Sequence, residues 1–206
     1  MKRFALGLSL AVAVAFGMGP ASADIAVVAT KSSGIGTNTW ANPGSVTTTW
    51  NDATFEVPAQ RIDGMLVVMV AGEGTIGSVD ITWNGTPLTL QRAANLNAAY
   101  AFVYALAQPT AGTGPLIVTG PGGNRYGVTA IYATGVLGLE ASDAQSSGGA
   151  SELTAGPITP TAGALVVSAG GHSEGEFPNP PAPGMAAGST LLMNLTGRGS
   201  GGAVDY

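Results

Sequence analysis

The chain has 206 residues, of which 32 are Gly and 13 are Pro; 45% are hydrophobic and 9% are charged. This length predicts a single domain with enough chain to bury a sizeable core. The chain has no Cys and one His. That composition excludes disulfide frameworks, thiolate metal sites, cysteine nucleophiles and multi-histidine metal sites.

The first 23 residues have the three parts of a Sec-type signal peptide. Met1-Lys2-Arg3 is basic, the run Phe4–Met18 is apolar, and Ala21-Ser22-Ala23 supplies a small-residue cleavage site. Cleavage before Asp24 predicts a secreted protein, in the extracellular medium or the bacterial cell envelope. The alternative is an uncleaved N-terminal anchor. The remainder, 24–206, is expected to form one domain with a Gly-rich tail over 197–206.

Charge argues against two classes of partner. Without Lys2 and Arg3, the mature chain keeps five basic and all 12 acidic residues, a formal net charge of −7. The basic residues are scattered singly, which argues against nucleic acid and anionic lipid as partners. Gly, Pro or charge interrupts every later apolar run, so we expect no membrane span in the mature chain.

The mature chain is a series of short β-branched or alternating runs separated by Gly, Pro and Asn, which predicts an all-β fold, a sandwich or a barrel rather than βαβ units. The clearest local prediction is a type I′ hairpin at Asn84-Gly85, with Pro87 at a strand start or edge position. The run Met65–Ala71 echoes Ala164–Ala169, which suggests two similarly placed central strands. The expected strands are Ile25–Thr30, Val46–Trp50, Met65–Ala71, Val79–Trp83, Leu88–Arg92, Ala99–Leu106, Gly114–Thr119, Tyr126–Thr134, Ala164–Ala169 and Ser189–Leu195.

Three segments carry a family resemblance: Leu66-Val67-Val68, the run Val79–Leu90 with its Trp-Asn-Gly turn, and Ala105–Gly114. Together they resemble a widespread bacterial β-sandwich domain of exported and phage-associated proteins, which has no assigned activity. The resemblance covers roughly 64–195 and implies an antiparallel, jelly-roll-like sandwich. Family members continue with further strand beyond the equivalent of 201–203, so the resemblance implies that a final strand is lacking here.

An open sheet edge would expose unpaired amide and carbonyl groups. We therefore expect either self-association by strand addition or a chain that is marginally stable alone. The alternative is that Ile25–Thr30 already covers this edge.

Two motifs suggest enzyme or nucleotide sites, and neither has the required context. Gly171-His172-Ser173-Glu174-Gly175 matches the nucleophile elbow of hydrolases, which needs a following helix and a separate His base. Four prolines within 176–183 forbid that helix, and the only His is inside the motif. The run 72–77 matches G-x-G-x-x-G, but a strand follows it where a dinucleotide site needs a helix.

A weaker possibility is a metal site. His172, Glu174 and Glu176 alternate and would project to one side of an extended segment, and Glu73 follows the echoing strand. Oxygen ligands with one imidazole suit calcium or, less well, another divalent ion. The simpler interpretation is an exposed acidic loop.

Aromatic residues suggest a sugar-binding surface as a second possibility. Tyr100, Phe102, Tyr104 and Leu106 share one face of a strand, which we expect to be core rather than an exposed stacking platform. Trp40 and Trp50 lie near predicted loops and are the better candidates for binding a glycan.

These observations favour a non-catalytic extracellular or cell-surface β-sandwich that acts in adhesion, surface presentation or assembly. The expected partners are a glycan or surface protein, or a second copy joined by strand addition. The alternative is a carbohydrate-binding module that uses loop aromatics and calcium. We expect no catalytic residues and no other cofactor.

Overall fold

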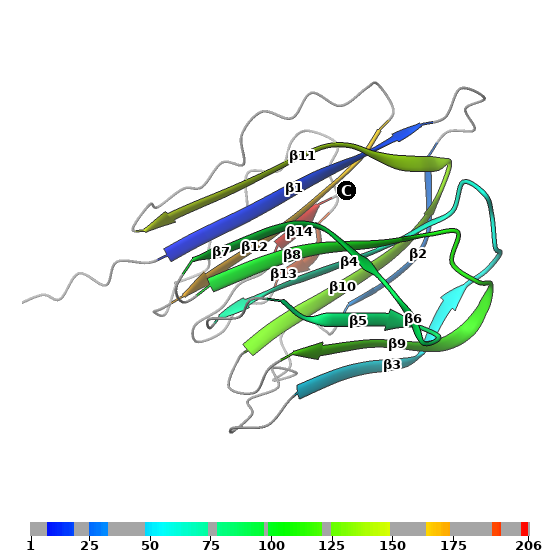
Figure 1. Cartoon of the computed structure of the whole chain (residues 1–206), viewed down its shortest axis with the longest axis horizontal. Coiled ribbons are helices and arrows are strands. Elements are labelled where there is room, and N and C mark those ends of the chain that lie inside the picture. Colours follow the sequence, from blue (N-terminus) through cyan, green and yellow to red (C-terminus); the bar gives the residue numbers. More distant parts are fainter. Residues whose placement is uncertain are drawn as a thin grey trace, which may run out of the picture.

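The computed structural model describes residues 8–18, 25–32, 48–73, 78–96, 99–120, 125–148, 164–173, 191–194 and 203–205. Every regular element in this part of the chain is a strand, and all strand pairs are antiparallel. The strands form three open sheets stacked in layers (Figure 1). The predicted all-β, antiparallel sandwich architecture is therefore confirmed, whereas a third layer was not anticipated.

The middle layer is a five-stranded sheet with the order β2-β10-β4-β8-β7. Its strands are β2 (Ala26–Ser32), β10 (Arg125–Thr134), β4 (Met65–Glu73), β8 (Ala99–Ala107) and β7 (Thr89–Leu96). The run Met65–Ala71 is buried at every position, as are Tyr100–Ala105 and Val128–Ala133. Strands covered on both faces need apolar residues at successive positions, which explains their continuous apolar sequences.

One outer layer is a five-stranded sheet with the order β11-β1-β12-β14-β13. Its strands are β11 (Val136–Gly148), β1 (Leu8–Met18), β12 (Leu165–Ser173), β14 (Ala203–Asp205) and β13 (Leu191–Asn194). Strands β1 and β12 pack on β8 of the middle sheet, and β12 also faces β4. Figure 1 shows β1 in blue between β11 and β12.

The other outer layer is a four-stranded sheet with the order β3-β9-β5-β6. Its strands are β3 (Thr48–Val57), β9 (Gly112–Gly120), β5 (Asp80–Trp83) and β6 (Thr86–Pro87). Asn84 and Gly85 join β5 to β6 with φ angles of 45° and 79°, both positive as a type I′ turn requires. Pro87 lies in the edge strand β6 opposite Thr82. Both hairpin predictions are confirmed.

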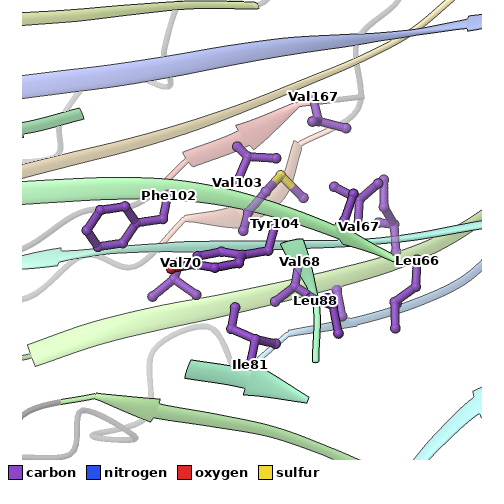
Figure 2. Packing of buried hydrophobic residues seen from close by; sticks show 14 of the residues in the cluster. Leu66, Val67, Val68, Val70, Ile81, Leu88, Phe102, Val103, Tyr104 and Val167 are labelled. Carbon is purple, nitrogen blue, oxygen red and sulfur yellow. The ribbon is translucent and has the colours of Figure 1, made fainter. Parts of the chain in front are cut away.

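One hydrophobic cluster runs through all three layers. Phe102 and Tyr104 of β8 lie on the side of Ile81 and Leu88, whereas Val103 lies on the side of Val167 (Figure 2). The predicted burial of the Tyr100, Phe102 and Tyr104 stripe is therefore confirmed. The alternate residues of β8 are buried as well, against the outer sheet that contains β12.

The two echoing runs become β4 and β12, which pack against each other from facing sheets. Each of the ten predicted strands overlaps a strand of the structure. Ile25–Thr30 corresponds to β2, which pairs with β10 at the edge of the middle sheet. The last residues of the expected tail include β14, which pairs with β12 and β13.

Two long strands were not predicted. Leu8–Met18, assigned above to a signal peptide, forms β1 and pairs along its length with β11. Strand β11 contains Gly, Ser and acidic residues with low strand propensity, and among the described strands it has one neighbour in the sheet, β1. Pairing with an apolar partner, rather than its own sequence, makes this segment a strand.

Candidate functional site

The residues predicted to bind a metal are only partly within the described chain. Strands β4 and β12 run the same way in Figure 1, so Glu73 and His172 lie near the ends of strands that finish at one end of the molecule. The backbone of Glu73 pairs with Arg125, and that of His172 pairs with Ser9. Glu174 and Glu176 lie outside the described residues. Within the described ranges, no three His, Asp or Glu side chains gather closely enough to hold a metal ion.

The candidate sugar-binding aromatics also have incomplete descriptions. Trp40 lies outside the described residues. Trp50 belongs to β3, an edge strand, where its backbone pairs with Val118. Trp83 is fully buried; its ring meets Phe55 edge-on at 5.7 Å, and its indole N–H donates to the carbonyl of Thr110 over 3.1 Å. Trp83 is therefore part of the core and not of a binding surface.

The two rejected motifs begin within strands. Gly171, His172 and Ser173 are the last residues of β12, and the rest of the elbow-like motif lies outside the described residues. The G-x-G-x-x-G run begins in β4, and β5 starts at Asp80 shortly after it. The predicted strand after that run is confirmed.

The turn before β4, residues 61–64 (the braced turn), lies at the opposite end of the molecule and is fastened at several points. Arg61 donates two hydrogen bonds to the Asp63 carboxylate, from Nε at 2.8 Å and from Nη2 at 2.9 Å. The backbone carbonyl of Asp63 accepts a bond from Val136, the first residue of β11, and Gly64 accepts one from Gln108. Through these bonds the turn is fastened to the loop between β8 and β9 and to the start of β11.

Tyr132 of β10 also contacts the braced turn. Its hydroxyl donates to the carbonyl of Ala59 over 2.6 Å, and its ring lies against Gly64. A Cβ at position 64 would collide with the Tyr132 hydroxyl, so Gly is needed there for close approach. Burial raises the pKa of Tyr132 above its ordinary value of 10.0, which keeps its hydroxyl protonated as a donor.

A second polar cluster links the middle sheet to the sheet containing β3. Lys31 of β2 lies 2.9 Å from the Asp52 carboxylate and donates to the Thr54 hydroxyl over 3.0 Å. The backbone and hydroxyl of Thr54 both donate to Asp52, at the irregularity where β3 shifts its register against β9. Burial acts to raise the pKa of Asp52, but the bonds from Lys31 and Thr54 outweigh it and lower the pKa below 3.8.

A third connection joins the outer sheet with β1 to the middle sheet. Arg92 of β7 lies 4.0 Å from the carboxylate of Asp143 in β11. Tyr104 provides a fourth connection, because its buried hydroxyl donates to the carbonyl of Val79 over 2.8 Å. Burial raises the pKa of Tyr104 above its ordinary value of 10.0. In these clusters the polar side chains fasten neighbouring segments to one another.

Comparisons with protein-family models, with curated proteins and with solved structures give no match for this chain. The described residues contain no helix of the length and apolar character needed to cross a membrane. The sequence pattern did not indicate the polar clusters at Arg61–Asp63 and Lys31–Asp52. Single charged residues separated by 20 or more positions give no periodic signal, since only the fold brings Lys31 and Asp52 together.

Proposed function

We propose that this protein is exported as residues 24–206 and acts outside the cytoplasm as a non-catalytic β-sandwich in adhesion, surface presentation or assembly. The observation that carries the proposal is that the polar side chains around the braced turn bond to other groups of the protein itself. There, Asp63 fixes the turn before β4, and Tyr132 bonds to a backbone carbonyl. General acid–base catalysis needs titratable groups aimed at a substrate, whereas these groups are aimed at the protein itself.

The same end presents apolar side chains on a rigid frame. Ile62 is 81% exposed at the tip of the turn held by the Arg61–Asp63 pair. Leu137, 53% exposed, follows the residue that donates to Asp63. A backbone that is already held in place loses little conformational entropy on binding, which favours contact with a surface protein.

Localisation is tested by intact-mass analysis of protein from the periplasm and medium of an expressing bacterium. The expected species begins at Asp24 and lacks Lys2 and Arg3. A cytoplasmic species that retains Met1 would contradict export.

The contact role is tested by binding of fluorescent protein to bacterial cells. Ile62→Ser should weaken binding several-fold, because it removes the most exposed apolar side chain of the braced turn. Val28→Ser is the matched control, since Val28 is 47% exposed on β2 and outside this turn. Equal binding by the two variants would contradict a role for the turn.

The carbohydrate-binding alternative is retained because Trp50 lies on an edge strand of an outer sheet. A glycan array with and without a chelator separates the two functions. Saturable glycan binding that is lost in Trp50→Ala would favour the alternative, and chelator sensitivity would implicate calcium. Binding unchanged by Trp50→Ala would argue against this residue as the sugar contact.

A further inference from the structure

Strand β1 lies between β11 and β12 in its sheet and is paired on both sides. On one side its residues pair with β11 from Leu8 opposite Gly148 to Met18 opposite Val136. On the other side they pair with β12 from Leu8 opposite Ser173 to Phe16 opposite Leu165. Removing β1 would leave two facing backbone edges about 9.5 Å apart, twice the spacing of neighbouring strands.

The side chains of β1 are part of the core. Val12, Val14 and Phe16 are fully buried in the cluster that runs through the three layers. Strand β1 packs over β7 and β8 of the middle sheet. Its sequence alternates large apolar residues at even positions with Ser, Ala or Gly at odd positions over 8–18. The position between β11 and β12 therefore accepts a strand with a defined side-chain pattern.

The export proposed above would remove this strand. Hydrolysis of the Ala23–Asp24 peptide bond leaves β2 to β14 on one chain and separates β1 from them. Counting the strands that the structure describes, β11 would lose its one neighbour in the sheet, and β12 would lose one of two. Unpaired edges beside an uncovered apolar core recruit added strands.

We propose that the position between β11 and β12 that β1 fills, here called the acceptor lane, is a strand-acceptor site. After export it is filled by a β-strand of another polypeptide that runs antiparallel to both neighbours. The donor has large apolar side chains at alternate positions, which replace those of Val12, Val14 and Phe16 against the middle sheet. This proposal rests on the proposed export. It specifies how the protein assembles with a partner.

The acceptor lane can be tested separately from export in the full chain. Residues 19–23 are replaced by a recognition sequence for a specific protease, and the chain is cleaved after it has folded with β1 in place. The severed N-terminal fragment is removed by gel filtration in urea, and the urea is then diluted out. A fluorescent peptide with the sequence of Leu8–Met18, flanked by lysines for solubility, is added. Fluorescence anisotropy measures its uptake, and the uncleaved chain is the control in which the lane is already occupied.

Two matched peptides test the side-chain pattern. Val12→Ser with Val14→Ser removes two buried apolar contacts and should weaken uptake about a hundredfold. Ala11→Ser with Ala13→Ser changes the same number of residues at small positions and should weaken it less than threefold. Equal weakening by both peptides would contradict an acceptor with the proposed side-chain pattern.

Each outcome of the uptake experiment either supports or overturns the proposed strand-acceptor site. Uptake by the cleaved chain, or refolding of a cleaved chain only when the peptide is present, supports it. Self-association that the peptide reverses also supports it and identifies a second copy as donor. A cleaved chain that stays folded without taking up peptide, that associates irreversibly, or that stays unfolded with peptide overturns it. The mass of the exported species, by contrast, decides only whether export occurs.

Discussion

The middle sheet and the outer sheet that contains β1 obtain their stability in different ways. Strand β4 pairs with β10 on one side and with β8 on the other, and each of the three carries apolar residues for both of its faces. In the outer sheet, by contrast, the 13-residue β11 is rich in Gly, Ser and acidic residues, and β1 is the one described strand with which it pairs. The middle sheet is thus encoded within its own strands, whereas the outer sheet depends on one segment near the N-terminus.

The largest effect is expected in the middle sheet. Phe102 is fully buried, stacks on Tyr100 at 5.5 Å and meets Tyr104 edge-on at 6.4 Å. Phe102→Ala should lower the free energy of unfolding by about 3–5 kcal/mol, measured by urea denaturation. The measurement is made on the full chain, because a chain that begins at Asp24 lacks β1, which packs over β8. A loss below about 1 kcal/mol would show that this layer is not the stable centre.

A smaller effect, limited to one form of the protein, is expected in β1. Val14→Ala should destabilise the full chain by about 1.5–3 kcal/mol, because it removes two fully buried methyl groups and leaves a cavity. Val28→Ala is the control, with an expected change within about 0.5 kcal/mol because Val28 is 47% exposed. If both variants behave alike in urea denaturation of the full chain, β1 is not a structural strand in solution.

The difference between the two sheets also explains which parts of the fold could be predicted. Met65–Ala71 and Ala99–Leu106 are long apolar runs between turn residues, and this pattern indicates a buried strand without further context. The Asn84-Gly85 turn was predictable because positive φ at both positions restricts the residues that fit. Strand β11 was not predictable, since its pairing depends on a segment more than 100 residues away whose sequence also fits a signal peptide.

The candidate site was less accessible to sequence reasoning than the fold. The proposed ligands His172, Glu174 and Glu176 share an alternating pattern, but such a pattern shows only which residues project to one side. The Arg61–Asp63 pair lies within one turn, yet its importance comes from the bond between Asp63 and Val136, which only the fold creates. Polar contacts between distant segments leave no periodic trace in a single sequence.

The hairpin provides the next comparison, within the sheet that contains β3. Gly85 has φ of 79° and open space around its missing side chain, so a substitution there tests backbone strain alone. Gly85→Ala should cost about 1 kcal/mol in urea denaturation, because a Cβ disfavours the left-handed conformation. Gly138→Ala in β11 is the control, since Gly138 also has open space but no positive φ. An equal cost at both positions would mean that the turn is not type I′ in solution.

The smallest effect concerns the cluster that fastens β2 to β3. The pKa of Asp52 lies below 3.8 because Lys31 and Thr54 donate hydrogen bonds to its carboxylate. A carboxylate whose pKa is lowered by folding stabilises the folded state above its unfolded pKa, and this contribution is lost as the pH falls through the folded value. The urea midpoint should therefore decrease between about pH 5 and pH 3.

In Asp52→Asn this decrease should be smaller, and the midpoint near pH 7 should be lower by an amount equivalent to about 0.5–1 kcal/mol. Glu56→Gln at the exposed position four residues along β3 is the control, and it should leave the midpoint near pH 7 nearly unchanged. If Asp52→Asn shows the same acid dependence as the unaltered chain, the link between β2 and β3 makes no measurable contribution, and the middle sheet is held to this outer layer by its apolar contacts alone.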